Sequence, residues 1–92
     1  MPISKDDYEA GLDPKAREML DFLRANPLDK GYTVMDVYAS IYSDEEKSAH
    51  LRASGGIGER FREIQRWLNE FREREYVKSK IVSATIFYSA SE

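Results

Sequence analysis

A long amphipathic helix that runs directly into a β-rich segment fills residues 55–88, and this order constrains the fold more than any other feature. Five apolar residues recur there at helical spacing: Ile57, Phe61, Ile64, Leu68 and Phe71. At about 100° per residue they form one stripe that faces a core, with Trp67 at its edge. We therefore predict a helix over residues 57–75. The β-branched and aromatic residues that follow predict a two-stranded hairpin over residues 76–89.

The opposite side of this helix carries a second aligned stripe, formed by Arg62, Gln65, Arg66 and Asn69. Arg can pair bidentately with guanine, and Gln or Asn with adenine, so these four are candidates for reading base edges. Acidic residues are interleaved, however, and Glu59–Arg62 and Arg66–Glu70 have the spacing of ordinary helix ion pairs. A solvated surface of mixed charge is therefore the competing interpretation, and the residues alone leave both open.

The expected hairpin carries Lys78 and Lys80, which share a strand face because they are two residues apart. They are candidates for contacts with a phosphate backbone, or for edge charges that block unwanted strand pairing. The connection holds no Gly, Asn or Asp, so we expect a loop over residues 81–84 rather than a tight turn. Ile81 or Val82 would then be exposed at the tip. Ile86 or Phe87 is expected to join the core.

The first half of the chain holds signals for three shorter helices. Asp13 before Pro14 predicts a helix that starts there and runs to about Ala25. Two boxes of the capping type, beginning at Thr33 and at Ser43, predict helices that end near residues 42 and 53. The last of these is mostly polar, and Leu51 is its main apolar anchor. Residues 28–30 are expected to be a loop and residues 31–33 a short extended piece. Residues 1–12 lack a pattern and are expected to be a flexible N-terminal arm before a domain over residues 13–90.

Composition narrows the function. The chain has 92 residues and a net charge of −3, split into −5 over residues 1–48 and +2 over residues 49–92. It has no Cys and a single His, His50, which we expect at the surface, so we expect no catalytic residue, no metal site, no cofactor and no enzyme activity. There is no long apolar run and no signal peptide, which predicts a cytoplasmic protein without a membrane partner.

The order helix, extended piece, helix, helix and hairpin resembles a winged helix-turn-helix domain of the kind found in small prokaryotic repressors. The likeness is strongest at Tyr76-Val77-Lys78-Ser79-Lys80 and Thr85-Ile86-Phe87-Tyr88, which is similar to the wing of those proteins. The chain departs from them in its apolar wing tip and in the extra short helix between helix two and the recognition helix. The fold class expected is mainly α with a small antiparallel β-hairpin.

The resemblance implies a duplex-DNA-binding protein, a small transcription regulator that acts as a homodimer. Arg62, Gln65, Arg66 and Asn69 would read bases, and Lys78 and Lys80 would hold the backbone. Residues 1–12, which carry Ile3, Tyr8 and Leu12, and the first helix would supply the dimer contact. The alternative is a winged-helix module that binds another protein and no DNA, which the acidic balance and the apolar wing tip favour.

Overall fold

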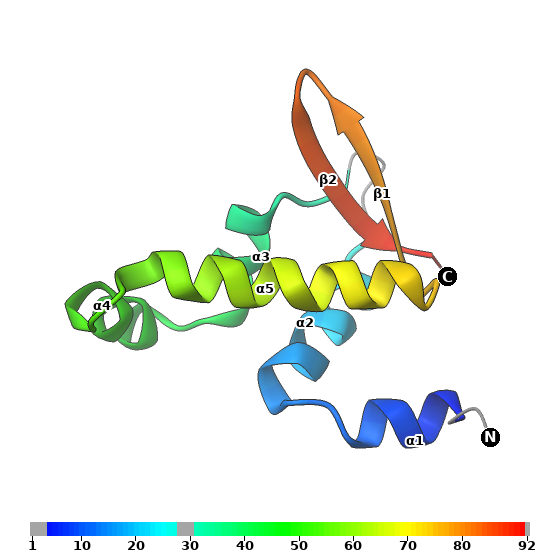
Figure 1. Cartoon of the computed structure of the whole chain (residues 1–92), viewed down its shortest axis with the longest axis horizontal. Helices are drawn as coiled ribbons and strands as arrows, with labels where there is room; N and C mark the ends of the chain where they lie inside the picture. Colours follow the sequence, from blue (N-terminus) through cyan, green and yellow to red (C-terminus); the bar gives the residue numbers. More distant parts are fainter. Residues whose placement is uncertain (1–3, 28–30, 92) are drawn as a thin grey trace.

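The computed structural model describes residues 4–27 and 31–91, so Ile3 and the expected loop at 28–30 lie outside the described residues. The described residues form five helices and two strands: α1 (Lys5–Ala10), α2 (Pro14–Ala25), α3 (Val34–Ile41), α4 (Asp44–Arg52), α5 (Gly56–Glu73), β1 (Val77–Val82) and β2 (Thr85–Ala90). The expected class, mainly α with an antiparallel hairpin, is confirmed. Figure 1 shows α5 crossing the molecule, with the hairpin and α1 on opposite sides of it.

The helix starts follow the capping signals. The Asp13 side chain accepts a hydrogen bond from the Lys15 backbone N–H, and Pro14 occupies the first helical position of α2. Both expected capping boxes form, at Thr33 for α3 and at Ser43 for α4. In the second box the Ser43 backbone N–H donates to the Glu46 carboxylate at 2.9 Å, and this bond lowers the pKa of Glu46.

The sheet is a hairpin extended by one residue pair. Strands β1 and β2 pair antiparallel, and Tyr32 forms a bridge to Tyr88 on the other edge of β2 through two backbone bonds of 2.7 Å. The short extended piece expected at residues 31–33 is therefore present at the sheet. Gly31, at φ 85°, lies so close to β2 that a Cβ would come within 2.6 Å of the Tyr88 carbonyl oxygen.

The expectation of a loop over residues 81–84 was wrong, because a tight two-residue turn joins the two strands. Val82 pairs with Thr85, and Ser83 and Ala84 between them have φ values of 51° and 66°. Two positive φ angles are the signature of a type I′ turn, whose twist matches that of the strands. The register of the flanking strands imposes this turn on residues that do not favour it.

The core lies between α2, α3, α5 and the base of the hairpin. Ile64, Leu68 and Phe71 of α5 are fully buried, as the helical stripe predicted, and Trp67 is buried at its edge. Each such side chain contributes roughly 1.5–3 kcal/mol through the apolar surface it removes from water. Expecting Ile86 or Phe87 in this core was wrong. The hairpin instead contributes Val77 and Tyr88, which share one face of the sheet where that face meets α5.

Helix α4 is attached differently from expectation. It buries no residue, and Leu51, its expected anchor, is 67% exposed. His50, expected at the surface, is half-buried instead: its Nδ1 lies 2.9 Å from the Tyr38 hydroxyl, and its ring packs edge-on against Tyr42 with centroids 4.7 Å apart. An imidazole thus holds α4 to α3 where an apolar side chain was expected.

The segment expected as an arm contains α1, which packs on the domain. Tyr8 lies edge-on against Phe71 and Tyr76, with ring centroids 6.5 and 5.7 Å away. Glu9 forms an ion pair of 2.7 Å with Arg24 of α2. Tyr8 is the only large apolar side chain between Lys5 and Ala10, which is too few to form a helical stripe, so these contacts hold α1 on the domain.

Candidate nucleic-acid interface

The outward face of α5 presents two exposed arginines, Arg62 and Arg66, one helical turn apart. Neither forms a hydrogen bond or an ion pair with any residue that the structure describes. The helix ion pairs considered from the sequence, Glu59–Arg62 and Arg66–Glu70, are absent among these residues. Both guanidinium groups are therefore available to an anionic partner.

The acids near these arginines are partly occupied elsewhere. Glu63 pairs with Arg60 at 3.2 Å. Glu70 accepts a hydrogen bond of 2.6 Å from the Tyr8 hydroxyl and lies 3.9 Å from Arg74. Burial, together with this bond to Glu70, raises the pKa of Tyr8, so the phenol stays a neutral donor. Helix α1 thus helps to keep Glu70 away from Arg66.

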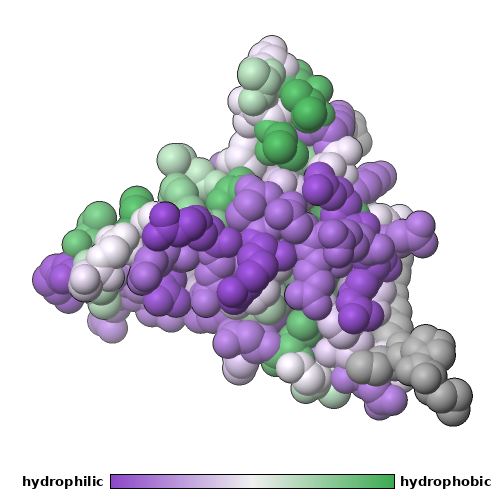
Figure 2. All heavy atoms as spheres, viewed as in Figure 1, coloured by the Kyte–Doolittle hydropathy of each residue, from purple (hydrophilic) through white to green (hydrophobic). Residues whose placement is uncertain are grey.

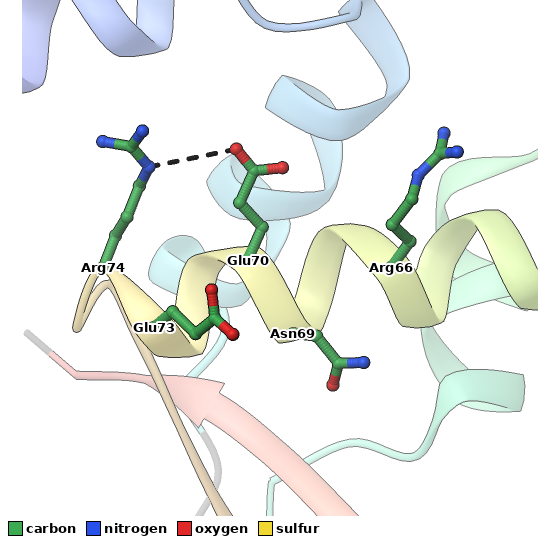
Figure 3. A pocket seen from close by; sticks show the side chains of 5 residues that line it. All are labelled: Arg66, Asn69, Glu70, Glu73 and Arg74. Carbon is green, nitrogen blue, oxygen red and sulfur yellow. Dashed lines mark ion pairs between the residues drawn. The ribbon is translucent and has the colours of Figure 1, made fainter.

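Two shallow hollows on this face meet at Arg66. Figure 3 shows the one toward the C-terminal end of α5, with the pair between Arg74 and Glu70 marked. Its five lining residues are two arginines, two glutamates and an asparagine: Arg66, Asn69, Glu70, Glu73 and Arg74. The other hollow is lined by Glu59, Arg60, Arg62, Glu63 and Arg66. The face is thus mixed in charge, and Arg66 borders both hollows.

Gln65 and Asn69 are half-buried and are tied into the fold by hydrogen bonds. The Gln65 side-chain nitrogen Nε2 donates to the Tyr88 hydroxyl at 2.6 Å and to the side-chain oxygen Oδ1 of Asn69 at 3.2 Å. Arg72 donates to the same Asn69 oxygen at 3.5 Å and to the Ser79 hydroxyl at 3.3 Å. Both N–H groups of the Gln65 amide are used, so an adenine contact by Gln65 would break its bond to β2. This network joins α5 to the hairpin.

Lys78 and Lys80 are exposed and share a strand face, as expected. Ser79 and Tyr88 of the alternate face contact α5, so the two lysines lie on the side of the hairpin that faces away from α5. The structure therefore brings Arg62 and Arg66 together. It places Lys78 and Lys80 on the face of the hairpin that is turned away from α5 and its two arginines.

The free end of the hairpin is apolar. Ile81 is 71% exposed, Val82 42% and Ile86 39%. Ile81 and Ile86 are directly paired across the strands. Figure 2 shows apolar atoms gathered toward this end, beside the hydrophilic surface that runs along α5. The expectation of an exposed Ile81 or Val82 is confirmed, although a tight turn rather than a loop exposes them.

Two further features, a cluster of metal ligands and a membrane-spanning helix, are absent from the part of the chain that the structure describes. No group of three or more His, Cys, Asp or Glu side chains lies close enough to hold a metal ion among these residues. Within the same ranges, none of the helices combines the length and the apolar character needed to cross a membrane.

Comparison of the chain with family models, with curated proteins and with solved structures found no match.

Proposed function

We propose that this chain is a winged-helix protein that binds duplex DNA, with α5 in the major groove and the hairpin as its wing. The element order supports the proposal, since α2, α3 and α5 precede a hairpin whose β2 pairs with Tyr32. The observation that carries it is the pair Arg62 and Arg66, exposed one turn apart without a partner among the described residues. Unpaired arginines on an outward helix face suit the guanine edge.

In this arrangement the two lysines of the hairpin would contact the DNA backbone. A hairpin that enters a groove has phosphates on both of its sides. Lys78 and Lys80, on the side away from α5, would reach the phosphates that α5 does not approach. Gln65 acts here as a positioning residue, because its bond to Tyr88 sets the angle between α5 and the hairpin.

The test is an anisotropy titration of a random duplex at about 50 and 200 mM salt. Phosphate contacts by Lys78 and Lys80 predict a slope of log K against log salt of about −2. Lys78→Ala should reduce the slope by about one unit. On a duplex selected for tight binding, Arg66→Ala should weaken binding by about 1–3 kcal/mol. Arg17→Ala, which removes an exposed charge from α2, is the matched control and should change neither quantity.

A homodimer would place two α5 helices about one DNA turn apart. Tyr8 and Leu12, expected at its contact, pack against the core of their own chain. The homodimer stays a prediction. Sedimentation that finds only monomer at tens of micromolar, roughly the range in which functional dimers survive, would remove it.

A protein-binding module is the second candidate, and the exposed apolar end of the hairpin favours it. Apolar side chains of this kind can anchor a protein partner. The same titration separates the two functions, because a protein-binding module would leave duplex DNA unbound even at low salt.

A further inference from the structure

The hairpin combines positive charge with an exposed apolar end. Residues 76–91 hold two lysines and no acidic residue, in a chain whose net charge is −3. Three apolar side chains, Ile81, Val82 and Ile86, lie exposed beyond these lysines. A partner that matches this segment must offer negative charge at its surface and an apolar surface deeper inside, where the end of the hairpin would reach.

The apolar end is held in a defined direction. The turn at Ser83 and Ala84 is only two residues long, which makes the end narrow. The bonds from Gln65 to Tyr88 and from Arg72 to Ser79 fasten the base of the hairpin to α5. Figure 1 shows the rest of the hairpin projecting beyond the helices.

The cross-strand pair Ile81 and Ile86 lies on the same hairpin face as Ser79 and Tyr88, which contact α5. This face continues past α5 toward the free end. A duplex that lies against the outward side of α5 would therefore meet the isoleucine pair.

We propose that the end of the hairpin enters the minor groove and inserts Ile81, supported by Ile86, against a base step, which bends the DNA. This inference rests on the proposed function and adds a preference for deformable duplexes. The minor groove offers phosphates at its rim and stacked bases within, which matches the lysines and the isoleucines. Apolar wedges of this kind unstack a step and kink the duplex, most readily at pyrimidine–purine steps.

The experiment uses the whole chain and two end-labelled duplexes of about 30 base pairs, one with central TpA steps and one with a stiff A-tract. Energy transfer between the labels reports bending. The wild type should bring the ends of the TpA duplex closer and bind it about tenfold more tightly than the A-tract duplex, equivalent to about 1.4 kcal/mol of deformation energy. Ile81→Ser should abolish the bend and reduce the affinity ratio to about one.

Leu51→Ser is the matched control, because Leu51 of α4 is exposed to a similar degree and should leave the bend unchanged. Salt-dependent binding with a ratio of one in the wild type would overturn the wedge and leave the proposed function standing. Failure to bind any duplex would remove both. Binding of vesicles that contain anionic lipid, with no duplex binding and with loss in Ile81→Ser, would assign the hairpin end to a lipid surface and overturn the proposal.

Discussion

Gln65→Ala is expected to destabilise the fold, although Gln65 lies on the side of α5 that the sequence assigns to base reading. The Gln65 amide donates to the hydroxyl of Tyr88 at 2.6 Å, and Tyr88 is only 1% exposed. A hydrogen bond of this kind contributes about 0.5–1.5 kcal/mol net, and more is lost when a buried partner is left unsatisfied. We therefore expect a loss of about 1–2 kcal/mol in the free energy of unfolding.

The assay is urea unfolding of Gln65→Ala, Tyr88→Phe and the double variant, followed by circular dichroism. If the two groups bond as described, the cycle should yield a coupling energy of about 1 kcal/mol. Arg62→Ala is the matched control on the same helix and should stay within about 0.5 kcal/mol of wild type, because its side chain is exposed. Effects that add within about 0.3 kcal/mol would refute the link between α5 and the hairpin.

Three backbone positions give further predictions, each measured by thermal or urea unfolding. Glu75→Gly should raise the free energy of unfolding by about 1 kcal/mol, because Glu75 follows α5 at φ 65°, where a side chain costs energy. A lower free energy of unfolding in this variant would mean that the conformation carries no cost. Ala84→Gly should give a similar gain of about 1 kcal/mol in the turn, at φ 66°, and an unchanged midpoint would argue against the type I′ geometry. Gly31→Ala should cost more than about 1 kcal/mol, because its Cβ would meet the backbone oxygen of Tyr88; wild-type stability would show that Gly31 does not lie against β2.

Helix starts were predictable from the sequence because short-range chemistry decides them. The side chains of Asp13, Thr33 and Ser43 each accept from a backbone N–H within three residues, so a local pattern contains the whole interaction. The inward stripe of α5 was predictable for a related reason. Its fixed period places Ile64 and Leu68 on one side, whatever they pack against.

The turn and α1 were not predictable, because distant contacts decide them. Strand register forces Ser83 and Ala84 into the left-handed region, against their local preference. Helix α1 depends on the bond of Tyr8 to Glu70 of α5, 62 positions away. No pattern within residues 1–12 contains that partner.

The sequence predicted which residue types lie at the candidate site, but it did not predict which of these side chains are free to bind a partner. Spacing placed Arg62, Gln65, Arg66 and Asn69 on one side of a helix, and the structure keeps them there. Only the fold shows that Tyr88 engages Gln65 and that Tyr8 and Arg74 engage Glu70. A free arginine and a bonded glutamine look alike in a sequence, because the difference lies in segments that pack against them.

Protection of guanine N7 from methylation tests most directly whether α5 lies in the major groove, since N7 is exposed only there. The duplex would be the tightest binder selected from a random pool, at a salt concentration that saturates the wild type. We expect at least one strongly protected guanine, with the protection lost in Arg62→Ala or Arg66→Ala and kept in Arg17→Ala. Fully reactive guanines in a saturated complex, or protection unchanged in both α5 variants, would contradict it.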